Sequence, residues 1–129
     1  MAEKTVITNE DIKNTENYLN SYKFCRQLLN MKNYEDRYFE TLEWESESPA
    51  EFSLARAKMF EIRHFILDLR NSKEKLLLYY HYVRGETVER CGELLGISRS
   101  SAFRLKKKAL EMAFERSVSI GKNLVADRF

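Results

Sequence analysis

Basic residues crowd a short segment in the last third of the 129-residue chain. Segment 98–108 contains Arg99, Arg104 and three consecutive lysines, and the chain has no Asp or Glu between Glu93 and Glu111. Arg donates two hydrogen bonds to a guanine edge, Ser and Lys bond to bases or phosphates, and a Phe ring can touch a thymine methyl group. An ordinary solvated helix face is the alternative, but such a face usually carries acids as well. The segment therefore predicts contact with double-stranded DNA.

The residues around this basic segment have the types and spacing of two helices that cross steeply. Gly92 suits the point where the helices come closest, and Gly96 suits a turn residue with positive φ. Ser98 can cap the second helix with its hydroxyl. The positions that would be buried between the helices carry Cys91, Leu95, Ile97, Ala102 and Leu105. Together these features predict a helix-turn-helix over residues 88–107, with the helix 98–115 inserted in the major groove.

The longer segment 76–112 resembles region four of bacterial sigma factors. The matching pieces are Gly85-Glu86-Thr87, the run ELLGISR at 93–99 and Lys108-Ala109-Leu110. A module of this kind behind an N-terminal helical segment is similar to the ArpU/RinA-type transcription regulators of phages and mobile elements in Gram-positive bacteria. The resemblance implies a sequence-specific DNA-binding transcription regulator, with activation as the expected direction, or alternatively a sigma-like factor.

The resemblance also implies which residues contact DNA. The family's base- and phosphate-contacting positions correspond to Arg99, Ser100, Ser101, Phe103 and Arg104, and Thr87 and Lys107 are the expected phosphate contacts. With the rest of the basic segment, the candidate DNA-binding residues are Thr87, Ser98, Arg99, Ser100, Ser101, Phe103, Arg104, Lys106, Lys107 and Lys108. Primary sigma factors have Glu and Arg where this chain has Ser100, Ser101 and Phe103, so we expect a recognition site other than the usual promoter hexamer.

Two amphipathic helices are predicted ahead of this module. The first begins after Thr8, whose hydroxyl can cap it together with the acid three residues later, and it continues with apolar residues at helical spacing. The second begins at Ser48-Pro49, where Ser is the cap and Pro the first helical residue, and it runs to about Arg70. Neither helix would be stable alone in water, so each must bury its apolar face against another element or another copy.

The expected fold is therefore all-α, with an N-terminal helical region at 1–71 packed with a C-terminal helix-turn-helix domain at 72–129. The charge differs along the chain, because residues 1–75 carry a net charge of −2 and residues 76–129 carry +4. Since one helix-turn-helix covers few base pairs, we expect the acidic part to assemble a homodimer. Docking of the same helices on RNA polymerase is the alternative that the sigma resemblance allows.

The sequence lacks the residues that other functional classes require. Two cysteines, Cys25 and Cys91, are too few for a disulfide scaffold and have no metal-ligand spacing, and His64 and His81 are equally isolated. The sequence has no phosphate-binding loop or nucleophile motif, so we expect no enzyme, no cofactor and no metal. Without a secretory leader or an apolar run that could span a membrane, we expect a cytoplasmic, nucleoid-associated protein. A phage small terminase subunit, and a module whose basic helix binds an acidic protein, are the remaining alternatives.

Overall fold

The computed structural model describes residues 6–38 and 50–124, with side chains described over 6–33 and 52–124. The elements are α1 Asn9–Tyr38, α2 Ala50–Leu67, α3 Lys73–Leu78, the π-helix η1 Tyr79–Val83, α4 Val88–Leu95 and α5 Arg99–Ser119. No residue in the two described ranges lies in a β-strand. The prediction of an all-α fold is therefore confirmed.

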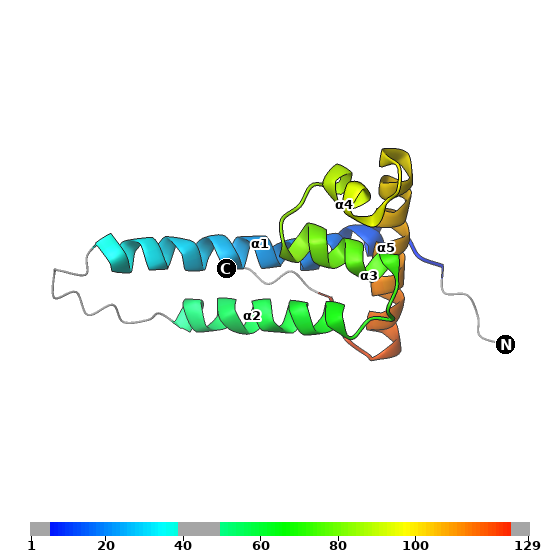
Figure 1. Ribbon diagram of the computed structural model, residues 1–129. Coiled ribbons are helices and arrows are strands. Elements are labelled where there is room, and N and C mark those ends of the chain that lie inside the picture. The colour runs from blue at the N-terminus through cyan, green and yellow to red at the C-terminus, as the bar shows by residue number, and fades with distance from the viewer. Residues whose placement is uncertain (1–5, 39–49, 125–129) are drawn as a thin grey trace.

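α1 and α2 form a long antiparallel hairpin that projects from the rest of the molecule (Figure 1). A capping box holds the start of α1, because the Asp11 amide donates to the Thr8 hydroxyl oxygen at 3.1 Å and the Thr8 amide donates to the Asp11 carboxylate at 3.0 Å. The predicted start of the first helix is thus confirmed. The predicted cap at Ser48-Pro49 lies outside the described residues, and α2 ends at Leu67, slightly earlier than the sequence predicts.

The hydrophobic core lies where α5 crosses the end of this hairpin (Figure 1). Its buried members are Tyr18, Leu19, Tyr22, Ile62, Phe65, Ile66, Leu69, Leu78, Tyr82, Val83, Ala109, Leu110, Ala113 and Leu124. They come from α1, α2, α3, η1, α5 and the segments that follow α2 and α5. The two predicted parts, 1–71 and 72–129, therefore bury their apolar faces in one shared core. That the two parts have different roles remains a prediction.

η1 is a π-helical turn that continues directly from α3 and leads into the loop before α4. The Arg84 amide donates to the Tyr79 carbonyl oxygen at 3.1 Å, which closes the wide turn. Gly85 then takes a left-handed φ of 75°, which a glycine adopts without steric cost. The turn directs Tyr82 toward α1, where its hydroxyl donates a hydrogen bond to Glu16 at 2.6 Å.

Candidate nucleic-acid interface

α4 and α5 are joined by the three residues 96–98, and a side-chain cap precedes each helix. Before α4, the Thr87 hydroxyl accepts a hydrogen bond from the Arg90 amide at 3.1 Å, and before α5 the Ser98 hydroxyl accepts one from the Ser101 amide at 3.2 Å. Gly96 takes a φ of 70°, in the left-handed region that favours glycine. The sequence predicts both this turn residue and the cap at Ser98, and the structure confirms both.

The crossing of α4 and α5 brings the two helices so close at Gly92 that even a Cβ atom there would be crowded. A Cβ at this position would lie 3.0 Å from the Ala102 Cβ and 3.3 Å from the Ile97 carbonyl oxygen, closer than ordinary contacts. Cys91 and Ala102 are fully buried at the crossing. Burial and then the charge of Glu86 raise the pKa of the Cys91 thiol, which favours its neutral form. The predicted close approach is therefore present, and it fixes the direction of α5 relative to α4.

The first turns of α5 present an exposed face on the side of the helix opposite the buried Ala102 and Ala109. The exposed residues on it are Arg99, Ser100, Phe103, Arg104, Lys107 and Lys108. Ala102 and Ala109 are buried on the opposite side of the helix. Steps of three and four residues keep the exposed side chains on one side. Six of the candidate DNA-binding residues thus share one accessible surface, which we call the α5 face.

Three cations of the α5 face have no carboxylate partner. Within the part of the chain that the structure describes, Arg104, Lys107 and Lys108 form no ion pair. Arg99 lies 3.4 Å from Glu89 of α4, and its guanidinium is 5.9 Å from the centre of the Phe103 ring. An exposed ion pair of this kind contributes little to stability, so Arg99 can exchange its partner at low cost. The α5 face therefore carries positive charge that no carboxylate of the described residues neutralises.

The other four candidate residues are engaged within the protein. Thr87 and Ser98 act as helix caps, and the Ser98 hydroxyl also donates to the Ser101 hydroxyl at 2.9 Å. Lys106 is only partly exposed, and its ammonium lies 2.9 Å from the Glu16 carboxylate on α1. The structure thus gives Lys106 a partner on the hairpin, whereas its neighbours Lys107 and Lys108 face the solvent.

Sequence reasoning missed the carboxylate that holds α5 against α1. Glu16 accepts a hydrogen bond from the Tyr82 hydroxyl at 2.6 Å in addition to its ion pair with Lys106. Burial alone would raise the pKa of Glu16, but the hydrogen bonds from Tyr82 and Lys106 and the charge of Lys106 hold that pKa below its ordinary value. No local pattern signals this contact, because the three residues are far apart in the sequence and meet only in the folded chain.

The described part of the chain contains no group of three or more His, Cys, Asp or Glu side chains arranged to hold a metal ion. None of the helices in those residues is long and apolar enough to cross a membrane. Comparisons with protein-family models, with curated proteins and with solved structures find no match.

Proposed function

We propose that this protein is a sequence-specific, DNA-binding transcription regulator that inserts the N-terminal half of α5 in the major groove. One observation carries the proposal: the α5 face holds three cations that have no carboxylate partner among the described residues, on a helix whose direction is fixed by the crossing at Gly92. The major groove admits an α-helix, and a helix that is already fixed loses little freedom when it binds. The resemblance to sigma region four and to ArpU/RinA-type regulators supports the same function.

The α5 face offers both base-reading and phosphate-binding side chains. The Arg104 guanidinium can donate two hydrogen bonds to a guanine edge, and the Phe103 ring offers an apolar edge to a thymine methyl group. Lys107, one turn further along, suits a phosphate, which positions the protein without reading sequence. Lys106 has a different role in this proposal, because its ion pair with Glu16 orients α5 on the hairpin.

We further propose that two copies bind one DNA site and that the α1–α2 hairpins form the contact between them. A symmetric pair doubles the length of DNA that is read, with half-sites about one helical turn apart. The hairpin exposes the large apolar side chains Phe24, Met31, Leu54 and Phe60, which are 45% to 64% exposed. Docking on RNA polymerase is the competing use of this surface, and a protein that stays monomeric on DNA would favour it.

Selection of bound duplexes from a randomised library, followed by titration at several salt concentrations, tests the proposed DNA binding. We expect Arg104→Ala to weaken binding to the selected duplex by about 1–3 kcal/mol and to relax the preference at one base pair. Lys107→Gln should weaken binding to all duplexes similarly and reduce the slope of log affinity against log salt by about 1. Lys73→Gln is the matched control, because it removes the same charge from an exposed position on α3.

Two results would contradict this function. If Arg104→Ala and Lys107→Gln bind as the Lys73→Gln control does, α5 does not lie in the groove. If the parent protein binds no duplex even at low salt, the basic helix serves instead as a module that binds an acidic protein.

A further inference from the structure

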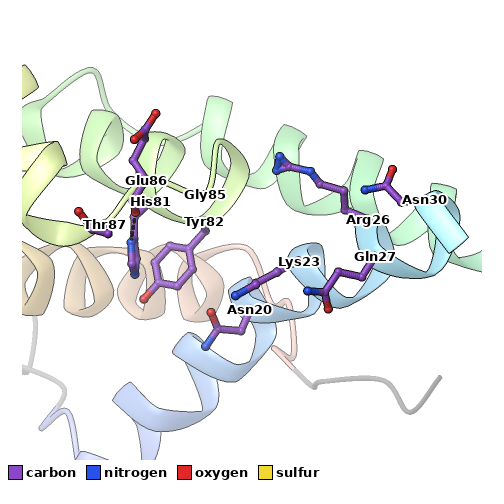
Figure 2. Close-up of a pocket in the computed structure, with 10 residues that line it drawn as sticks. All are labelled: Asn20, Lys23, Arg26, Gln27, Asn30, His81, Tyr82, Gly85, Glu86 and Thr87. Carbon is purple, nitrogen blue, oxygen red and sulfur yellow. Dashed lines mark hydrogen bonds between the residues drawn. The ribbon is translucent and has the colours of Figure 1, made fainter.

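A hollow of about 560 Å³ lies between α1 and the loop that leads into α4 (Figure 2). One wall consists of the α1 residues Asn20, Lys23, Arg26, Gln27 and Asn30, and the loop 85–87 forms part of the other. Figure 2 shows Asn20, Lys23 and Gln27 following one another along α1. The volume is in the range of sites that hold a ligand.

The α1 wall of this hollow is rich in hydrogen-bond donors and contains no acid. α1 has no Asp or Glu between Glu16 and Glu35, although the chain has 20 acidic residues in 129. The acidic residue Glu86 lines the hollow from the loop before α4. Figure 2 shows its carboxylate extending away from the side chains on α1. Amide and ammonium donors without a competing carboxylate suit a phosphate oxygen, and the bond to an ammonium is charge-assisted.

Four side chains of this wall are available to a ligand. Arg26 is already committed, because its guanidinium donates to the Val83 carbonyl oxygen at 3.0 Å. The other four are exposed and form no side-chain hydrogen bond or ion pair within the described residues: Asn20, Lys23, Gln27 and Asn30. Their spacing of three and four residues places them in one stripe along the helix. With a rise of 1.5 Å per residue, the stripe is about 15 Å long.

The hollow also reaches Thr87, the cap of α4 and a candidate phosphate contact. A DNA strand near Thr87 would therefore have the α1 stripe beside it. Because one strand presents a phosphate for each step of about 3.4 Å along the duplex axis, a stripe of this length is long enough to reach more than one phosphate. The hydrogen-bond donors of the α1 stripe, the absence of acids between Glu16 and Glu35, and the position next to Thr87 all suit contact with the DNA backbone.

We propose that the α1 stripe binds phosphates of the DNA strand that flanks the site read by α5, with Lys23 as its ionic contact. This inference rests on the proposed function and extends the DNA interface from α4 and α5 onto the hairpin. It gives the hairpin a second role beside self-association, which leaves the exposed apolar side chains Leu54 and Phe60 of α2 for contact with a second copy.

Titration of the full chain with the selected duplex tests the inference through matched pairs of variants. Lys23→Gln should reduce the slope of log affinity against log salt by about 0.9. If parent and variant bind equally at 1 M salt, this change of slope makes the variant bind about fivefold more weakly at 0.15 M salt. Lys13→Gln is the control, because Lys13 is an exposed lysine of α1 outside the hollow. Asn20→Asp should also weaken binding, whereas Asn14→Asp adds its charge outside the hollow and should have a much smaller effect, since salt screens charges beyond about 8 Å.

Duplex length separates a phosphate contact from an indirect effect. Shortening the duplex to the site read by α5 removes the flanking phosphates, so the difference between the parent and Lys23→Gln should disappear. A difference that persists on the short duplex, or a salt slope for Lys23→Gln equal to that for Lys13→Gln, would overturn the inference. The proposed function would then still stand if Lys107→Gln lowers the slope, whereas a parent protein that binds no duplex would overturn both proposals.

Discussion

Replacing Gly92 by Ala tests how the protein fixes the direction of α5. The added methyl group would lie 3.0 Å from the Ala102 Cβ and 3.3 Å from the Ile97 carbonyl oxygen, so one of the two helices must shift by a few tenths of an ångström. Overpacking of this kind costs about 1–3 kcal/mol, whereas replacing Gly by Ala inside a helix gains about 1 kcal/mol. We therefore expect Gly92→Ala to lower the free energy of unfolding by up to about 2 kcal/mol.

The double variant Gly92→Ala/Ala102→Gly separates the steric cost from the gain in helix propensity. Ala102→Gly alone should cost about 1–2 kcal/mol, because it loses helix propensity and a buried methyl group. In that background the methyl group at position 92 enters the space that Ala102 has vacated. Gly92→Ala should then stabilise the protein by up to about 1 kcal/mol, and the coupling between the two sites should reach about 1–3 kcal/mol.

Urea unfolding of the parent, the two single variants and the double variant measures this coupling, with an unchanged m value as the check that all four unfold in the same way. Titration with the selected duplex adds a functional readout, because a shift of α5 should weaken specific binding more than non-specific binding. A coupling below about 0.5 kcal/mol would refute the reasoning, since it would mean that α4 and α5 separate freely and that the crossing at Gly92 does not fix α5.

Three further predictions concern the turn, the contact between α5 and α1, and the hairpin. Gly96→Val should lower the free energy of unfolding more than Gly96→Asn, because β-branched residues resist the left-handed φ that Asn tolerates, and equal melting temperatures would contradict this. Since the pKa of Glu16 is held below its ordinary value, its interactions stabilise the fold at neutral pH and are lost as the pH falls through the lowered folded-state pKa. Unfolding across a pH series should therefore show Glu16→Gln less stable than the parent at neutral pH, with the difference closing in acid, and a difference independent of pH would argue against the ion pair. Leu54→Glu and Phe60→Glu should each convert a dimer to a monomer in sedimentation of the full chain. The control Leu76→Glu, which places the same acid at an exposed leucine of α3, should not. A parent protein that is monomeric with DNA present would exclude the dimer.

Much of the candidate site could be predicted from the sequence because its determinants are local. The caps at Thr87 and Ser98 bond to amides three residues further along the chain, and Gly96 is selected by the φ of its own residue. Gly92 could be assigned to the crossing because two helices joined by so short a turn must approach each other closely near that turn. The acid-free run around Arg104 is likewise visible in the sequence alone, and helical spacing places it on one face.

The sequence by itself thus determined the all-α class, the start of α1 and the α4–turn–α5 unit, whereas the tertiary structure decided which lysines of the basic run on α5 have a partner among the described residues. In the sequence, Lys106, Lys107 and Lys108 form one uniform basic run. In the structure, the packing of α5 against the hairpin turns Lys106 toward Glu16 and leaves Lys107 and Lys108 exposed. The same packing creates the hollow beside α1 and unites both halves of the chain in one core. Helical periodicity gives the relative directions of side chains on one helix. Which face of that helix is buried depends on contacts between elements far apart in the sequence, and those contacts form only when the chain folds.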